Sequence, residues 1–430
     1  METDVSIKRL GSRYHITWPN GVEAHVSRIR ENPERIKCEV AITLDGKLLT
    51  RSSPVLTSES GKDSLIRKLQ RRRPKEDWGI DHEVLIEQLA AMVIDAHREG
   101  AEPLKLAEVP EDNSLLWRIE GILPEGQPSL LYGDGGSGKS MVACWLAVMV
   151  DQGYNDTELK IVTEPGRVLM LDWETDEYEI AKRVRGLMRG LNLKGKTGIV
   201  YRRCTQPLIA EIDRVMDICD EYDISFIVCD SLGLASGGAL EEADATLQFF
   251  NALRMLGRTT LVISHINKAG QNFGSVYANN SSRMSWAQEG SRSDSGDGLD
   301  LAMFHRKANT VAQQAPRGWH IHFGDDGTIR FETRDVYDTQ FAGSLTTPQL
   351  VYKIISNDGP VSRDQIKEKV AHEKNKKLTD IEGAVNSAVS RMKQNNKIVE
   401  DNTGLHLVTS DPIPINAAPF VPGDRVEIEI

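Results

Sequence analysis

One eight-residue stretch of the sequence has the residue types and spacing of a phosphate-binding loop. It is GDGGSGKS, which fits the pattern G-x-x-x-x-G-K-[ST] and lies between an apolar run and a helical pattern. Its glycines let backbone N–H groups converge on phosphate oxygens, and the N-terminus of the following helix favours negative charge. The residues predicted to bind phosphate are Gly133, Asp134, Gly135, Gly136, Ser137, Gly138, Lys139 and Ser140.

The last two residues of this loop carry side chains with definite chemistry. The ammonium group of Lys139 is expected to neutralise the β- and γ-phosphates of ATP, and the hydroxyl of Ser140 is expected to hold Mg²⁺. We therefore predict ATP and Mg²⁺ as cofactors and ATP hydrolysis as the reaction. The alternative is a chance glycine turn, which the flanking strand and helix patterns disfavour.

Carboxylates follow two further apolar runs. The run Ile224–Cys229 leads into Asp230, a position from which a carboxylate reaches the magnesium shell beside a phosphate loop; a helix cap is the alternative. The run Arg167–Leu171 leads into Asp172 and Glu174. Glu174 is the candidate that polarises the attacking water. Asp172 is the competing candidate, and a strand-end carboxylate without a role is the other alternative.

The region that must position these residues alternates short apolar strands with helical stretches. From about Ser114 to Thr333 this pattern predicts an α/β fold, with a mainly parallel sheet and helices on both faces, and we assign residues 114–335 to it. The stretch Glu289–Gly298, rich in Ser, Gly and Asp, is predicted to be a mobile loop. Strands are predicted at Gln127–Tyr132, Arg167–Leu171, Ser225–Cys229 and Thr260–Ser264, and helices at Ser140–Asp151, Glu177–Gly190, Ala210–Glu221 and Glu242–Leu256.

Further parts flank this core on both sides. Residues 1–100 are predicted to form an α+β accessory domain, since short half-alternating runs precede apolar residues at helical spacing. Residues 101–113 are polar, contain two prolines and are predicted to be a linker. Residues 345–410 show the order of three helices and two strands, and residues 411–430, with four prolines, are predicted to be an extended tail. The N-terminal strands are predicted at Tyr14–Trp18, Glu23–Arg28 and Ile36–Leu44.

The C-terminal unit resembles winged-helix domains in its order of elements. Its third predicted helix offers Arg391 and Lys393 as candidate DNA-binding residues. The segment Val351–Glu400 holds ten lysines and arginines against seven acids, a mildly basic balance. Docking to another protein is the alternative role for such a module.

The composition restricts the classes of protein to which the chain can belong. Its 430 residues are 40% hydrophobic and 27% charged, an ordinary globular balance. A net charge of −11 excludes a passive nucleic-acid coat, so any DNA contact must come from local basic groups. No signal-type stretch opens the sequence, and the longest apolar run, Met141–Val150, is far shorter than the roughly 20 residues of a membrane span. We expect a cytoplasmic protein with no membrane partner. Five scattered cysteines are predicted to be isolated core thiols: Cys38, Cys144, Cys204, Cys219 and Cys229.

Several of these motifs together resemble one branch of a known family. The phosphate loop, LDWE, FIVCDS, LVISHINKAG and the lead-in LWRIEGILPEGQPSLLYG are similar to the RepA-type branch of the RecA-like ATPases. That branch includes hexameric helicases of plasmids, phages and integrating elements. The resemblance covers roughly Leu115–Thr333, about half of the chain, and implies a RecA-like core.

The resemblance also implies roles for residues that the motifs alone do not explain. His265 corresponds to the residue that senses the γ-phosphate and couples it to DNA, with a polar core histidine as the alternative. The segment from Gly274 through Arg283 and Trp286 corresponds to one that faces a central channel. Lys268 and Arg283 are therefore candidates for contact with the DNA backbone, and surface solvation is the alternative.

A ring requires a cation that acts on the neighbouring subunit's nucleotide. In related motors a basic pair after a strand such as Leu299–Phe304 reaches that γ-phosphate, and Lys307 matches one member of the pair. Asn309 stands where many relatives have arginine, so Arg306 and Arg283 remain alternative trans-acting residues. Such a cation can contribute roughly 10³–10⁵ in rate.

These inferences converge on an ATP-hydrolysing DNA motor. We expect a ring-forming replicative-type DNA helicase of a mobile element, a homo-oligomer and by resemblance a hexamer, that acts on single-stranded DNA. A primase or an initiator is a candidate partner. One alternative is a RecA-like ATP-dependent DNA-binding regulator or loader without unwinding activity. Another is a sequence-specific repressor whose ATPase core only sets its oligomeric state.

Overall fold

The structure is a computed structural model in which the chain divides into two compact units. The first comprises residues 1–315 with 319–333, and the second comprises residues 316–318 with 334–430. None of the helices in the described parts of the chain combines the length and apolar content that a bilayer crossing demands. The described residues are 5–10, 13–32, 35–72, 81–99, 105–108, 116–238, 243–265, 276–293, 296, 298–309 and 311–408.

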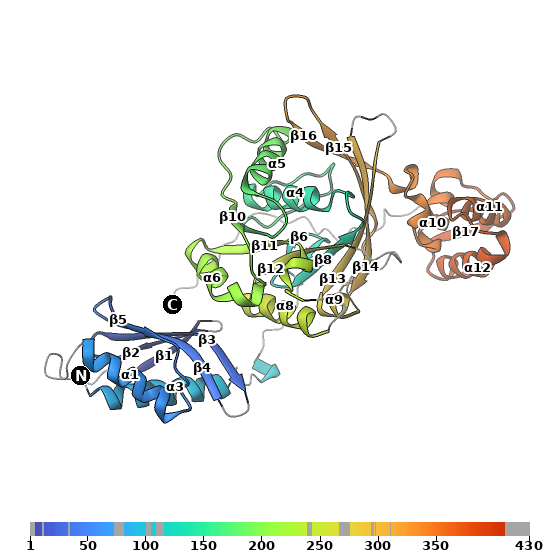
Figure 1. Cartoon of the computed structure of the whole chain (residues 1–430). Helices are drawn as coiled ribbons and strands as arrows, with labels where there is room; N and C mark the ends of the chain where they lie inside the picture. Colours follow the sequence, from blue (N-terminus) through green and yellow to red (C-terminus); the bar gives the residue numbers. More distant parts are fainter. Residues whose placement is uncertain are drawn as a thin grey trace. The chain divides into compact units, whose positions relative to one another are not determined.

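The N-terminal part of the first unit is a five-stranded antiparallel sheet with two helices on one face (Figure 1). Its strands follow the chain order, and alternate residues such as Ile16 and Val26 are fully buried. The turn between the last two strands places Asp45 and Gly46 at φ values of 47° and 75°, which suits a tight hairpin. These elements are β1 (Ser6–Leu10), β2 (Arg13–Thr17), β3 (Val22–Asn32), β4 (Arg35–Leu44), β5 (Lys47–Ser52), α1 (Glu59–Arg72) and α3 (His82–Glu99).

A nine-stranded sheet forms the centre of the first unit. Its order is β10-β9-β11-β12-β8-β13-β14-β15-β16, and the pairs from β10 through β13 are all parallel. The pair β13–β14 is antiparallel. The predicted α/β class with a mainly parallel sheet is confirmed. The strands are β8 (Pro128–Gly133), β9 (Arg167–Asp172), β10 (Val200–Arg203), β11 (Ile224–Asp230), β12 (Thr259–His265), β13 (Met284–Arg292), β14 (Gly298–Ala308), β15 (Arg317–Phe323) and β16 (Ile329–Arg334).

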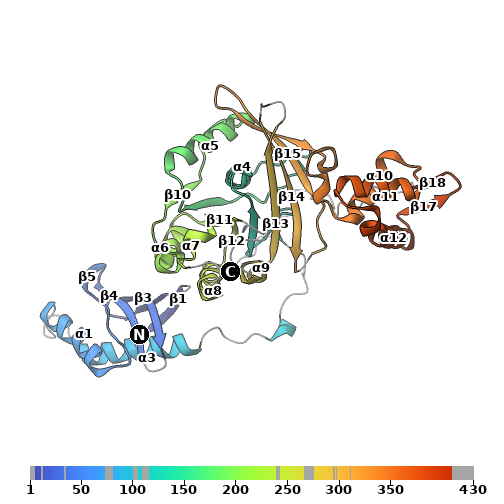
Figure 2. The same ribbon diagram turned by 45° about the vertical axis from the view of Figure 1, so that its right-hand side comes forward.

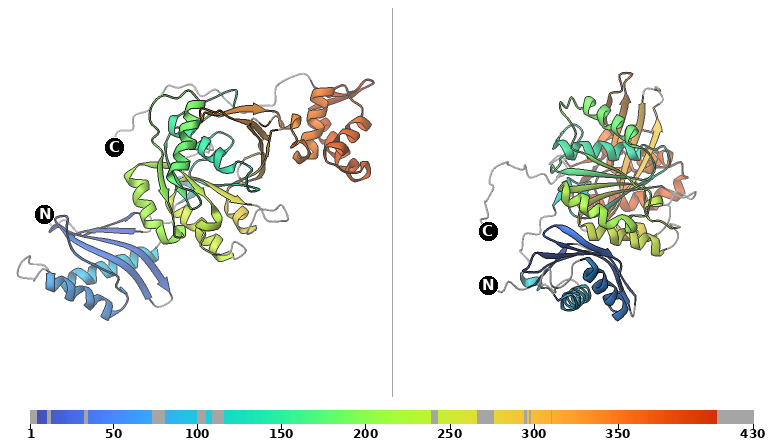
Figure 3. Two further views of the ribbon diagram at one scale, coloured as in Figure 1. Left: turned by 45° about the horizontal axis from the view of Figure 1, so that its top comes forward. Right: turned by 60° about the vertical axis from the view of Figure 1, so that its left-hand side comes forward.

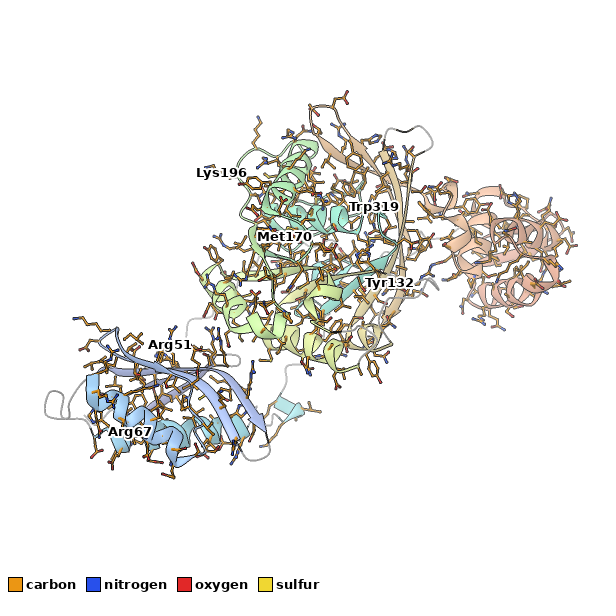
Figure 4. The ribbon with its side chains drawn as sticks, in the orientation of Figure 1. Arg51, Arg67, Tyr132, Met170, Lys196 and Trp319 are labelled. Carbon is orange, nitrogen blue, oxygen red and sulfur yellow. The ribbon has the colours of Figure 1, made fainter. Side chains whose placement is uncertain are left out.

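Helices cover both faces of this sheet, as Figure 3 shows. Val168 and Met170 pack with the residues of α4 and α5, whereas Leu169 and Leu171 pack with those of α6 and α8. The strands are therefore apolar on both sides, which explains their continuous hydrophobic runs. In Figure 4 Met170 lies inside this unit and Lys196 projects from it. The helices are α4 (Lys139–Gln152), α5 (Glu177–Gly190), α6 (Leu208–Glu221) and α8 (Ala243–Leu256).

The strands β13 to β16 extend the sheet beyond the phosphate loop. Trp145 of α4 stacks on Phe331 with ring centroids 4.1 Å apart and meets Trp319 edge-on at 5.2 Å. The prediction of a mobile loop over Glu289–Gly298 is wrong in its first half. Residues as far as Arg292 belong to β13, since their backbone pairs with β14.

The second unit contains three helices followed by a β-hairpin (Figure 2), which is the predicted order of elements. Two of the helices begin with a capping box, in which Thr346 and Ser362 each exchange hydrogen bonds with a glutamine three residues later. Apolar positions such as Ile354 and Val385 are fully buried. The elements are α10 (Thr347–Asp358), α11 (Arg363–Glu373), α12 (Leu378–Gln394), β17 (Ile398–Asp401) and β18 (Gly404–Leu407).

The five cysteines are all free and buried, as predicted. Burial raises the pKa of Cys38 and of Cys204 to about 12, so neither thiol is activated. The remaining short elements of the chain are η1 (Leu106–Glu108), β6 (Trp117–Ile119), β7 (Leu123–Pro124), α7 (Leu232–Ala235), α9 (Val276–Ser281), η2 (Val336–Asp338) and η3 (Ala342–Ser344).

Candidate nucleotide site

The sequence-predicted site residues meet where the parallel strands end. The last residue of β12, His265, is the register partner of Gly133, the last residue of β8. The last residue of β11, Asp230, is likewise the partner of Asp172 on β9. The carboxyl ends of parallel strands are where α/β sheets bind ligands. The edge that carries these four residues is therefore the candidate nucleotide site.

The phosphate loop has the backbone conformation that its glycines allow. Gly136 and Gly138 have φ values of 79° and 83°, in the left-handed region that L side chains rarely adopt. A Cβ atom added at Gly135 or Gly136 would meet nothing within 4 Å, so this side of the loop is open. Helix α4 begins directly after the loop, and no side chain caps its N-terminus. Its first N–H groups are therefore available to an anion.

Lys139 is buried at the base of the loop. Its side-chain nitrogen donates to the backbone oxygens of Gly133, at 2.9 Å, and Asp134, at 2.6 Å. Burial lowers the pKa of Lys139, whereas the nearby carboxylates of Asp230 and Glu174 act in the opposite direction. The ammonium group therefore lies beneath the open side of the loop. It can bind a phosphate there if it exchanges its hydrogen bonds with Gly133 and Asp134 for phosphate oxygens.

Asp230 lies beside Ser140 and is 6% exposed. Burial raises the pKa of Asp230 to about 6; the hydrogen bond from Ser140 lowers that pKa, and the charges of Glu174 and Asp172 raise it. Within the described residues its Oδ1 has no hydrogen-bond partner. A buried carboxylate with a vacant oxygen next to a hydroxyl is suited to a hard cation, which takes oxygen ligands.

Glu174 lies in the turn after β9, opposite the end of β12. Its Oε1 accepts a hydrogen bond from the hydroxyl of Ser231 and lies 3.6 Å from Nε2 of His265. The side chains of Glu174 and His265 are 35% and 45% exposed, so both are accessible from solvent. Sequence reasoning did not single out Ser231, which holds Glu174 in place. Its only signal was its position directly after Asp230.

Asp172, the competing candidate for the base, has a different role in the structure. It is 1% exposed, and its carboxylate accepts hydrogen bonds from the backbone of Glu174 (2.9 Å) and Thr175 (3.0 Å). The hydroxyls of Thr175 and Tyr201 also donate to it. These four bonds occupy its oxygens, so Asp172 fixes the turn that presents Glu174. The geometry favours Glu174 as the residue that meets water.

Residues of β13 and β14 that the sequence did not single out pack against the phosphate loop and support it. The side chain of Gln288 donates to the backbone oxygen of Ser137 at 2.6 Å, and it is 2% exposed. A Cβ atom at Gly133 would lie 2.1 Å from the backbone oxygen of Gln288, and one at Gly138 would lie 2.7 Å from Leu299. These two glycines are therefore required by close approach. No pattern in the sequence marked Gln288, because the strand that contains it was not predicted.

The donor set fits Mg·ATP. The chain offers a buried ammonium group at Lys139, the neighbouring hydroxyl and carboxylate of Ser140 and Asp230, and uncapped N–H groups at the start of α4. Ser140 and Asp230 are the residues that would hold Mg²⁺, and the bound ion would supply charge neutralisation at the phosphates.

The three candidate trans-acting cations differ in their surroundings. Lys307 donates to three backbone oxygens at the end of α9, those of Asn279 (2.6 Å), Asn280 (3.1 Å) and Ser282 (2.7 Å). Its ammonium group is therefore engaged within its own chain, as a helix cap.

Arg306 and Arg283 are both exposed. The guanidinium of Arg306 lies 4.9 Å from the ring centroid of Phe304, and that of Arg283 donates to Gln127 at 3.3 Å. The exposure of these two arginines, against the engagement of Lys307 by three backbone oxygens, favours them over Lys307.

The candidate DNA-binding residues also differ in their surroundings. Lys268 lies outside the described residues. Lys393 forms an ion pair of 2.8 Å with Glu400, whereas Arg391 is exposed and has no ion pair in the described part of the chain. The prediction that the channel-facing segment continues through Trp286 is wrong. That side chain is fully buried in β13 and donates to the backbone of Ile122 at 3.2 Å.

Comparison with known proteins agrees with this geometry. A family model described as an AAA domain matches residues 101–271, which include the phosphate loop, Glu174 and Asp230. The matched residues also contain the five strands β8 to β12 of the central sheet. No curated protein sequence matches the chain.

Two solved structures are similar to about half of the chain. A KaiC-like protein from Pyrococcus horikoshii is 14% identical with a TM-score of 0.36, and the match covers 54% of this chain and 99% of that one. The flagellar accessory protein FlaH from Methanocaldococcus jannaschii is 16% identical with a TM-score of 0.35, covering 50% of this chain and 93% of that one. At these scores the likenesses carry no argument about function, which rests on the site itself.

Proposed function

We propose that this chain is an ATP-driven motor that acts on DNA as a ring of identical subunits, in the manner of a replicative helicase. The observation that carries the proposal is the distance of 3.6 Å between His265 Nε2 and Glu174 Oε1 at the edge of the phosphate loop. His265 is the last residue of β12. A change at Glu174 during hydrolysis would therefore be transmitted to the segment that follows His265.

The residues of the chain would divide the chemistry of hydrolysis among them. Lys139 would exchange its contacts with Gly133 and Asp134 for phosphate oxygens, and Ser140 and Asp230 would hold the magnesium ion. Glu174 would orient the attacking water and accept its proton. The hydrogen bond from the hydroxyl of Ser231 to Glu174 would break or persist as the charge at the site changes.

The ring is supported by what the site lacks within one subunit. Lys139 lies beneath the phosphate loop, where it donates to Gly133 and Asp134, and the charge of Arg183 on α5 acts on Asp230. A cation from a neighbouring copy would add charge on the open side of the loop, and Arg306 and Arg283 are the candidates. A trans-acting arginine can contribute about 10³–10⁵ in rate.

The C-terminal unit would add a second contact with DNA, or a docking site for a partner such as a primase or an initiator. Its element order supports a winged helix, in which α12 would approach a groove. Arg391 is the exposed cation of α12 with no acid paired to it in the described chain, whereas Lys393 would have to leave Glu400.

The proposal is tested by steady-state ATP hydrolysis with and without single-stranded DNA. We expect DNA to stimulate the wild type strongly, Lys139→Ala to be inactive in both conditions, and Lys196→Ala, an exposed lysine in a loop, to match the wild type. Hydrolysis that ignores DNA would contradict the motor and favour an ATP-dependent regulator or loader. Unwinding of a forked duplex by the wild type would then distinguish a helicase from a translocase.

A further inference from the structure

Three potential metal-binding side chains gather on the outer face of the N-terminal sheet. His15 on β2 is the direct cross-strand partner of His25 on β3, and Glu23 lies two residues before His25 on the same strand. Residues two apart on a strand point to the same face. The intervening positions, such as Ile16 and Ala24, are fully buried against the helices, so the three side chains face away from that core.

The three donor atoms converge on one region. The Oε2 atom of Glu23 lies 3.3 Å from Nε2 of His15 and 3.9 Å from Nε2 of His25, and all three lie within 4.8 Å of one another. The two imidazole rings stack at a centroid distance of 4.3 Å with planes 5° apart. Because an imidazole nitrogen binds a metal in the plane of its ring, one ring must turn out of this stack for both Nε2 atoms to reach one ion.

These separations match the edges of a metal coordination shell. Zinc binds histidine nitrogen and carboxylate oxygen at about 2.0–2.2 Å, so two ligands at a tetrahedral centre are about 3.3 Å apart. The His15–Glu23 distance already has this value, whereas the His25 ring must turn out of the stack and shorten its distance of 3.9 Å to Glu23. The side chains are 24%, 43% and 55% exposed for His15, Glu23 and His25, so an ion can enter from solvent.

We propose that His15, Glu23 and His25 form a binding site for a divalent transition-metal ion, with zinc as the first ion to test. Two histidines and a carboxylate are a common ligand set for such ions, and three protein ligands leave a coordination position for water or for a group of a bound partner. The ion would tie β2 to β3 on the face of the sheet opposite α1 and α3, where Arg13 pairs with Asp217 of α6 and both charges act on His25. This site is separate from the phosphate loop and does not depend on ATP hydrolysis.

A second pair of neighbouring histidines provides a matched control. His320 and His322 on β15 have ring centroids 4.2 Å apart and planes tilted by 60°. Each contacts a different carboxylate, Asp300 at 2.6 Å and Glu332 at 3.0 Å. This pair therefore has the same kinds of side chain as His15 and His25, but its two imidazoles do not contact one shared carboxylate oxygen.

The test is calorimetric titration of the full-length, nucleotide-free protein with ZnCl₂, repeated with Co²⁺, whose visible absorption reports the ligand set. We expect one ion per chain in the wild type and in His322→Gln. Binding should weaken at least about tenfold in His25→Ala and in Glu23→Gln, since loss of an outer-shell partner alone costs about 10–100-fold.

Circular dichroism of each variant would verify that the sheet is intact, which is expected because none of the three side chains belongs to the buried core of the sheet. The proposal would be overturned if the wild-type protein did not bind zinc at a stoichiometry of one ion per chain. So would folded His25→Ala or Glu23→Gln protein that binds zinc as tightly as the wild type.

Discussion

Replacement of Asp230 by asparagine isolates the electrostatic cost of the nucleotide site. Asp230 is 6% exposed, and burial raises its pKa from 3.8 to about 6. A shift of this size corresponds to about 3 kcal/mol of penalty on the ionised carboxylate at pH 8. Asp230 also supports the charge of Lys139, which offsets part of the gain. We therefore expect Asp230→Asn to raise the free energy of unfolding of the nucleotide-free protein by about 1–2 kcal/mol at pH 8.

The pH dependence of this difference follows from the direction of the shift. Because the pKa of Asp230 is raised in the folded state, its contribution to stability is fully present below 3.8 and is lost as pH rises through about 6. The wild type and Asp230→Asn should therefore differ little at pH 4.5 and most at pH 8. Affinity for Mg·ATP should behave oppositely, since the metal requires the ionised carboxylate. It should fall below about pH 6 in the wild type and be weak at every pH in the variant.

Urea unfolding followed by tryptophan fluorescence measures the stability difference, because Trp145 and Trp286 lie in the same core as β11. Asp325→Asn, in the exposed turn between β15 and β16, is the matched control and should leave stability within about 0.5 kcal/mol of the wild type. An Asp230→Asn protein that is no more stable than the wild type at pH 8 would refute the claim that the site holds a costly buried charge.

Other predictions address the remaining groups of the core. Glu174→Gln should keep nucleotide binding but lower the turnover number by about 10²–10⁴, measured by hydrolysis beside equilibrium binding of a labelled nucleotide; equal loss of both would contradict its role as a base. Lys307→Ala should lower the free energy of unfolding by about 1–3 kcal/mol, because it leaves the carbonyl groups at the end of α9 without a donor. Arg306→Ala should lower turnover by about 10³ if Arg306 acts in trans, and assays of mixtures with Lys139→Ala subunits would test this. Burial lowers the pKa of His305, so its contribution to stability is complete above about pH 6.5 and declines as the pH falls below it; His305→Gln should flatten that slope in urea titrations.

The nucleotide site was predictable because its signals are local in the sequence. The phosphate loop, the strand that ends at Asp230 and the strand that ends before Glu174 each combine a continuous apolar run with a polar residue at its end. Burial on both sides of a parallel sheet produces such runs. The α/β class followed from the same pattern.

The packing of β13 and β14 against the phosphate loop was not predictable, because the sequence in this part of β13 lacks the pattern of a strand. The stretch that follows Gln288 is rich in Ser, Gly and charged residues, and its backbone is nevertheless paired along β14 as far as Arg292. Glycines there allow close packing, since a Cβ atom at Gly290 would lie 2.4 Å from the backbone oxygen of Ser137. Tertiary contact, rather than propensity, decides this segment.

Side-chain roles that depend on partners far away in the chain could not be predicted from the sequence either. Nothing in the spacing distinguishes Asp172, which fixes a turn, from Glu174, which faces solvent. The ammonium group of Lys307 is engaged by residues about 27 positions away in the chain. Such assignments need the coordinates of both partners.

The support that the β13–β14 strands give to the phosphate loop has a consequence for the smallest fragment that can work alone. The region similar to the AAA domain ends at residue 271, before Gln288 and Leu299, which line the loop. A fragment cut there would keep the phosphate loop, Asp230 and Glu174, yet it would expose Trp145, whose ring stacks on Phe331 of β16. The autonomous unit of this ATPase therefore extends at least through β16, and truncation libraries should yield soluble nucleotide-binding protein only beyond that strand.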